Sequence, residues 1–171
     1  MSTNCSQIEK FIIKTSDQQS CELIKEIVTS SEYFRDQIEI LEFNGKLLQG
    51  VIELTVPHTM EEIKFFEFYA NKIHEEEKEF LEVSKEKLVE EFNTKVSNLD
   101  KQTLDKLIKI VDYLGHETLL NRICDGIVKF LVKNKEHPEV IRKHYGLEDD
   151  LTDEEKDEIK KNFGFLFKED P

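Results

Sequence analysis

The stretch LDKQTLDKLIKIVDYLGHETLLNRICDGIVKFL, residues 99–131, contains the strongest structural signal in the chain. Its first half repeats apolar residues at spacings of three and four, which predicts an amphipathic helix that Gly115 ends. Its second half covers two faces of another helix with apolar residues, which predicts burial from more than one side and a buried Cys124. The first helix has its apolar positions at Leu104, Leu107, Ile108, Val111 and Leu114.

The residues on the N-terminal side of this stretch predict a small mixed front half. The segments 11–13 and 21–23 flank a polar turn and predict a β-hairpin. A third strand is expected over 51–56, where Pro57 ends it. Between the hairpin and this strand, two short helices are expected over 24–29 and 31–38.

A capping box formed by Thr59 and Glu62 predicts the start of a longer helix. Its inward face is expected to carry Ile63, Phe66, Tyr69, Ala70 and Ile73. Residues 75–92 are highly charged with sparse apolar positions, so we expect a solvated insertion or a marginal helix there.

The residues after the opening stretch predict two further helices. Pro138 and Gly146 bracket a short one, and a second capping box, Thr152 with Glu155, begins the last one. That helix runs into Phe163, Phe165, Leu166 and Phe167, whose full burial would contribute about 6 to 12 kcal/mol at roughly 1.5 to 3 kcal/mol each. Two covers for these rings remain open: the body of the same chain, or another protein.

Composition and charge exclude several classes of partner. The 171 residues have a formal net charge of -13, which repels phosphate backbones and anionic lipid surfaces, so neither nucleic acid nor a membrane is an expected partner. The N-terminus lacks the apolar core of a secretory signal, and the three cysteines are too widely spaced for a disulfide framework. We therefore expect localisation in the cytoplasm and nucleus.

The sequence offers little catalytic chemistry. No glycine-rich phosphate loop is present, and no carboxylate sits in an apolar context that would raise its pKa into a useful range. His137 and His144, seven residues apart, give only a weak hint of a metal site, and helix-end decoration is the preferred interpretation. We expect a protein that is not an enzyme and binds no cofactor or metal.

Several segments together resemble the family of S-phase-kinase-associated protein one, the adaptor subunit of SCF (cullin-RING) ubiquitin ligases. FIIKTSDQQSCELIKEIVTSSEYFRDQI is similar to the family's opening strand, turn and short helices, and LTVPHTMEEIKFFEFYANKI to its strand end and following helix. The stretch 99–131 resembles the part that usually contains D-Q-x-T-L, N-Y-L and L-L. HPEVIRKHYGLEDDLTDEEKDEIKKN resembles the family's ending.

The resemblance implies an α+β chain with a BTB/POZ fold and a C-terminal helical extension. It implies a cullin-facing domain over 1–132, with the charged insertion 75–92, and F-box-binding helices over 133–171. In this family the protein is a non-catalytic bridge that joins a cullin scaffold to F-box substrate receptors for protein ubiquitination and degradation. Weak self-association in the absence of an F-box partner is an accompanying expectation.

Carried over by position, the resemblance implies two contact surfaces. Tyr113 matches the family's cullin-contacting tyrosine, and Asp112 stands where asparagine is usual. The F-box surface is expected to comprise Leu120, Cys124, Leu131, Pro138, Ile141, Tyr145, Leu147, Ile159, Phe163, Phe165 and Phe167.

The chain also departs from the family pattern. It contains no tryptophan, so Phe165 stands where the tail usually has one and Val89 replaces the other. Asp112 adds a charge at the expected cullin contact. The alternative interpretation is therefore a BTB-fold interaction or structural protein that binds F-box-like helices outside a ubiquitin ligase.

Overall fold

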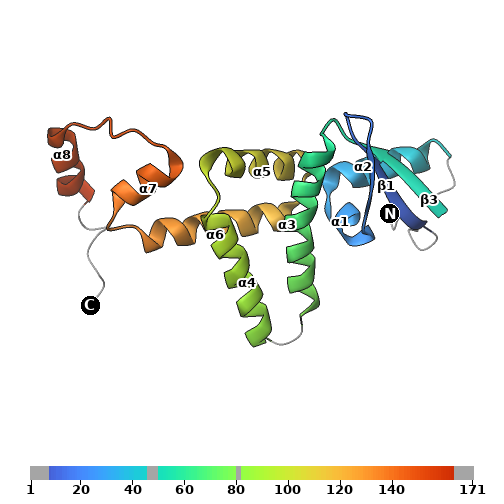
Figure 1. The fold of residues 1–171 in the computed structure, drawn as a ribbon, viewed down its shortest axis with the longest axis horizontal. Coiled ribbons are helices and arrows are strands. Elements are labelled where there is room, and N and C mark those ends of the chain that lie inside the picture. Colours follow the sequence, from blue (N-terminus) through green and yellow to red (C-terminus); the bar gives the residue numbers. More distant parts are fainter. Residues whose placement is uncertain (1–7, 46–49, 80–81, 164–171) are drawn as a thin grey trace. The chain divides into compact units, whose positions relative to one another are not determined.

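The computed structural model describes residues 8–45, 50–79 and 82–163 of the chain (Figure 1). It divides into two units, residues 1–133 and residues 134–171. The first unit combines a small sheet with six helices among its described residues, and the described part of the second is helical. This arrangement confirms the expected α+β class.

The sheet has three strands in the order β2-β1-β3. The predicted hairpin is confirmed, because β1 (Ile8–Lys14) and β2 (Ser20–Leu23) pair antiparallel with Phe11 opposite Leu23. The third strand, β3 (Gly50–Thr55), lies parallel to β1 on its other side, with Phe11 opposite Ile52. Side chains alternate along β3, so Ile52 and Leu54 are buried while Val51, Glu53 and Thr55 are exposed.

The crossover from the hairpin to β3 consists of α1 (Lys25–Ser30) and α2 (Glu32–Phe43). Both predicted helices are confirmed, and α2 extends beyond the expected end. Phe34 and Ile38 of α2 are buried, and the Gln37 side chain bonds the backbone of Thr55, accepting from its N–H at 3.0 Å and donating to its carbonyl at 2.7 Å. This double hydrogen bond fixes α2 beside β3.

The predicted capping box begins α3 (Met60–Lys78), where the Thr59 hydroxyl accepts from the Glu62 N–H and the Glu62 carboxylate accepts from the Thr59 N–H. Of the two alternatives expected for residues 75–92, the structure has a helix over most of the described residues and not a solvated insertion. The segment forms the end of α3 and most of α4 (Glu82–Ser97), and the two helices make a hairpin (Figure 1). Glu76 is buried against Arg122 of α6, and Phe92 is fully buried. These contacts hold a highly charged segment in regular helices.

The opening stretch forms α5 (Lys101–Leu114) and α6 (Glu117–Lys133). The predicted end of α5 is confirmed, because Gly115 adopts φ 62°. A Cβ at this position would also lie 2.7 Å from Cβ of Glu32, so the turn needs glycine for both its angle and its space.

Burial of α6 corrects one expectation. Leu119, Ile123 and Gly126 are buried, but Cys124 and Val128 are exposed, so within the first unit α6 is covered on one face only. Gly126 allows this close packing, because a Cβ there would lie 3.0 Å from the Val96 side chain of α4.

The second unit contains α7 (Pro138–Tyr145) and α8 (Asp153–Phe163). Both helix starts are as predicted: Pro138 is in the first turn of α7, and Thr152 and Glu155 form the capping box of α8. Gly146 ends α7 with φ 60°. None of the described side chains in this unit is buried.

Candidate protein-interaction site

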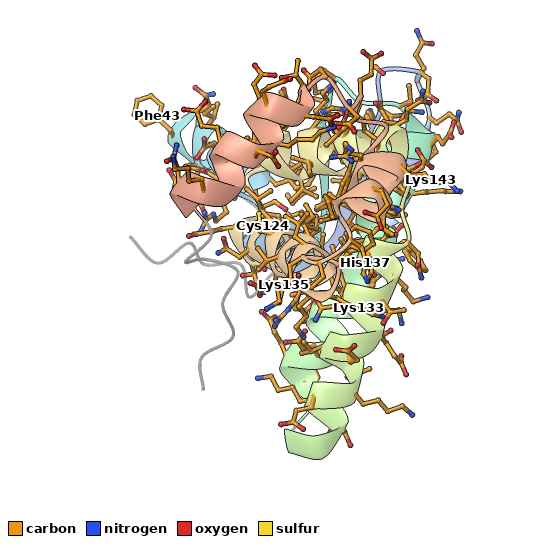
Figure 2. All side chains as sticks on the ribbon, turned by 90° about the vertical axis from the view of Figure 1, so that its left-hand side faces the viewer. Phe43, Cys124, Lys133, Lys135, His137 and Lys143 are labelled. Carbon is orange, nitrogen blue, oxygen red and sulfur yellow. The ribbon has the colours of Figure 1, made fainter. Side chains whose placement is uncertain are left out.

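An apolar stripe runs along the uncovered face of α6. We define it as Leu120, Cys124, Val128 and Leu131, whose spacings of four, four and three place them on one side of a helix. Val128 is 55% exposed and Leu131 is 37% exposed. Cys124 projects from the same helix in Figure 2. A stripe of this kind on an otherwise well-packed helix is typical of a surface that a partner covers.

The stripe contains three of the predicted F-box residues and adds Val128, which the resemblance did not supply. Val128 fills the position between Cys124 and Leu131, and Val132, one turn later, is 62% exposed. The four-residue spacing from Cys124 was the signal that could have identified Val128.

The second unit presents the remaining described F-box candidates. Leu147 is 51% exposed and Ile159 is 40% exposed. Pro138 is exposed, while Ile141 and Tyr145 are half-buried. Partial burial raises the pKa of the Tyr145 phenol. Phe165, Phe167 and the side chain of Phe163 lie outside the described residues.

Two ion pairs to Asp149 link α7 to α8. The Asp149 carboxylate lies 3.3 Å from Arg142 of α7 and 3.0 Å from Lys156 of α8. The hydrogen bond from Lys156 and the positive charge of Arg142 lower the pKa of Asp149. Exposed pairs of this kind each contribute little, typically about 0 to 1 kcal/mol. Weak polar contacts therefore organise the second unit, while Val140, Leu147, Leu151 and Ile159 remain exposed.

The second candidate surface centres on Tyr113 near the end of α5. Tyr113 is 44% exposed, and its ring centroid lies 5.0 Å from that of Tyr33 and 4.8 Å from that of His58. The neighbouring Asp112 is also exposed. The structure thus places Tyr113, one of the two predicted cullin-binding residues, against aromatic rings from two other segments of the chain.

The aromatic group is fixed by polar contacts. Burial and a hydrogen bond with Tyr113 raise the pKa of Tyr33 to about 12. His58 Nδ1 lies 3.4 Å from the Glu62 carboxylate. Hydrogen bonds from the backbone and side chain of Thr59 contribute to lowering the pKa of Glu62. Sequence reasoning missed Tyr33 and His58, since their proximity to Tyr113 depends on tertiary packing.

The turn between α5 and α6 joins the two candidate surfaces. A hollow of about 590 Å³ at this turn is lined by residues that include both Asp112 and Leu120. His116 is buried in the turn, and its Nδ1 accepts a hydrogen bond from the Leu119 N–H at 3.3 Å. Burial lowers the pKa of His116, so the ring stays neutral while it caps the start of α6.

The described residues contain no group of three or more His, Cys, Asp or Glu side chains that could hold a metal ion. Across the same residues, no helix combines the length and apolar character needed to cross a membrane.

Comparison with known proteins shows what the chain is similar to. A family model described as "Skp1 family, dimerisation domain" matches residues 117–163, which span α6, α7 and α8. SKP1-like protein 11 of Arabidopsis thaliana is 26% identical over 165 residues, covering 91% of this chain and 95% of the relative. The chain is thus similar to Skp1 proteins over most of its length and matches the family model over its last three helices.

Two shorter matches have higher sequence identity. SKP1-like protein 15 of Arabidopsis thaliana is 36% identical over 76 residues, 44% of this chain and 42% of the relative. The E3 ubiquitin ligase complex SCF subunit sconC of Emericella nidulans is 33% identical over 73 residues, 43% of this chain and 44% of that protein.

These matches confirm the resemblance to the Skp1 family seen in the sequence. The family has a BTB/POZ-like fold, in agreement with the small sheet and surrounding helices of the first unit. Skp1 proteins are non-catalytic, so the family relationship supports the expectation that this chain is not an enzyme.

Proposed function

We propose that this protein is the adaptor subunit of an SCF-type ubiquitin ligase. Its first unit docks on a cullin through Asp112 and Tyr113, and its α6 stripe and C-terminal helices hold the F-box of a substrate receptor. Such a bridge raises the effective concentration of a substrate beside the ubiquitin-charged enzyme. The names of the sconC relatives, which are SCF subunits, support this proposal.

The observation that carries the proposal is the apolar surface without a core. The stripe leaves Val128 and Leu131 exposed on α6, and no described side chain of the second unit is buried. An F-box that binds here would bury both the stripe and the exposed apolar side chains of the second unit. An aromatic or aliphatic anchor in a partner's pocket usually dominates an interface of this kind.

Binding measurements with purified partners test the F-box half. We expect Val128→Glu to weaken binding of an F-box domain by about tenfold or more, because it places a charge in the buried centre of the interface. The matched control is Phe43→Glu, an equally drastic change at a 91% exposed position of α2, which should leave F-box affinity unchanged. Equal losses in both variants would contradict the assigned surface.

A second pair of measurements tests the cullin half. Tyr113→Ala is expected to weaken binding of a cullin N-terminal domain while leaving F-box affinity intact, because the ring lies on the aromatic group and not on the stripe. Asp112→Asn, which restores the usual family residue, is expected to strengthen the same contact. Recovery of F-box proteins without any cullin would favour an interaction protein outside a ubiquitin ligase.

A further inference from the structure

A groove with aromatic walls lies between α3 and α5. Its volume is about 600 Å³, and its lining includes Phe65 and Phe68 of α3 and Ile110 of α5. Ile110 is buried, whereas Phe68 is 48% exposed. None of the described residues expected to contact a cullin or an F-box lines it. A hollow of this size is large enough to take an apolar side chain of a partner.

The Phe68 ring is held in place although half of it is exposed. Its centroid lies 5.2 Å from that of Tyr69, which is buried, and the two rings are nearly perpendicular. The Lys95 ammonium group of α4 lies 5.6 Å from the centre of the same ring. A ring that is already fixed loses little conformational entropy when a partner covers it, so Phe68 is suited to anchor an interface.

The groove continues the surface that carries Tyr113. On α5, Lys106 and Ile110 line the groove, and Tyr113 follows Ile110 by three residues, so all three lie on one side of the helix. On the α3 side, Thr59 lines the groove and directly follows His58, whose ring lies 4.8 Å from that of Tyr113. A partner that covers Tyr113 is therefore beside the entrance to the groove.

The acids of the groove already have a role in the fold. Glu61 and Glu62 are in the first turn of α3, where a negative charge complements the helix N-terminus. The Glu62 carboxylate also accepts the Thr59 N–H at 2.9 Å and lies 3.4 Å from His58 Nδ1.

The lysines of the groove are the charges that remain for a partner. Lys64 and Lys106 line it and are exposed, and the described residues give Lys106 no ion-pair partner. Lys95 adds a third positive charge beside Phe68. The complementary partner surface is an apolar side chain with carboxylates next to it.

We propose that this groove extends the cullin contact. An apolar side chain of the cullin packs against Phe68, and neighbouring carboxylates of the cullin meet Lys64 and Lys106. This extension rests on the proposed docking of a cullin at Tyr113, because one partner then covers both parts of a continuous surface. Phe68 and the two lysines would thereby help to determine which cullin the protein selects.

Binding of a purified cullin N-terminal domain to the full-length protein tests the groove. Phe68→Ala should weaken binding by about tenfold, because it removes the anchoring ring. Phe43→Ala is the matched control and should have no effect, since Phe43 is 91% exposed on α2 and its ring stands away from that helix in Figure 2. Both variants should keep the F-box affinity and the circular dichroism spectrum of the unaltered protein.

A photoreactive benzoylphenylalanine in place of Phe68 tests direct contact. It should crosslink to the cullin on irradiation, and the same group in place of Phe43 should not.

A charge reversal tests the role of the lysines. Lys106→Glu should weaken cullin binding by about threefold or more at low salt, and the loss should shrink as the salt concentration rises and screens the charges. Lys101→Glu is the control and should have no such effect, because Lys101 is exposed on the same helix but does not line the groove.

The outcomes separate this extension from the adaptor function. If Tyr113→Ala weakens cullin binding and Phe68→Ala does not, the extension is overturned and the adaptor function stands. If the unaltered protein binds no cullin, both are overturned. Weaker binding of Phe68→Ala without a crosslink from that position would overturn the extension, because the ring would then act only through the fold. Self-association that Phe68→Ala abolishes would assign the groove to a second copy and would likewise overturn it.

Discussion

The two units of this protein use their apolar residues in opposite ways. In the first unit, apolar side chains from Phe11 to Ile123 are withdrawn from water and form a core. In the second, Val140, Leu147, Leu151 and Ile159 are at least 40% exposed, and no described side chain is buried. Apolar burial supplies most of the favourable free energy of folding, so we expect the first unit to hold most of the stability.

A leucine-to-alanine substitution should destabilise the protein strongly in the first unit and hardly at all in the second. Leu107 is fully buried on α5, so Leu107→Ala should lower the free energy of unfolding by about 2 to 5 kcal/mol through lost burial and a cavity. Leu147→Ala, at a 51% exposed position, should change it by less than about 0.5 kcal/mol. Urea unfolding of both full-length variants measures the difference. A large loss from Leu147→Ala would show that the second unit belongs to the core.

The two helix-ending glycines offer a second matched pair. Gly115 and Gly146 have nearly the same backbone angle, φ 62° and φ 60°. Alanine costs about 1 to 2 kcal/mol in this conformation at either position. Only at Gly115 would the new Cβ also meet Glu32, whereas nothing lies within 4 Å at Gly146.

Gly115→Ala should therefore lower the midpoint of global unfolding clearly more than Gly146→Ala does. The expected effect of Gly146→Ala is a local loss of α7 helicity, which amide exchange detects. Equal shifts of the unfolding midpoint would contradict this expectation, because they would show that the two turns contribute equally to global stability.

The two units should also differ in the pH at which they lose stability, although this effect is smaller than those of the substitutions above. Burial holds the pKa of His116 below its ordinary value of 6.5, so the unfolded chain binds the proton more readily than the folded one. The contribution of His116 to stability is full above about pH 6.5 and is lost as the pH falls from there towards the folded-state pKa. In the second unit, Asp149 has a pKa below its ordinary 3.8, so its ion pairs are lost only in stronger acid.

Unfolding measured between pH 7 and pH 5 should therefore show a modest loss that His116→Asn removes, because asparagine keeps a side-chain acceptor at this helix start without titrating. Asp149→Asn is the control and should leave that slope unchanged. A slope that persists in His116→Asn would assign it to another group.

Local chemistry made most of the elements predictable. The capping boxes at Thr59 and Thr152 and the glycine at 115 fix helix ends through contacts within a few residues, and the structure has each of them. Alternation identified β3, and the three- and four-residue spacing identified α5. These signals depend on neighbouring residues, and neighbours are visible in a sequence.

The errors involve contacts between distant residues. The charged end of α3 reads as a solvated segment until Arg122, 46 residues later, pairs with Glu76. Cys124 lies in a pattern that predicts burial on two faces, yet the first unit covers only one face of α6. The grouping of Tyr33 and His58 around Tyr113 has the same origin, because it joins three separate segments.

The pairing of Glu76 with Arg122 has a consequence for the order in which the chain matures on the ribosome. During synthesis Glu76 emerges well before Arg122, so its carboxylate stays hydrated until α6 is made and packs against the hairpin. Helix α6 therefore completes the core and creates the stripe in one event. The same helix that neutralises the buried Glu76 on one face therefore carries the exposed apolar stripe on the other.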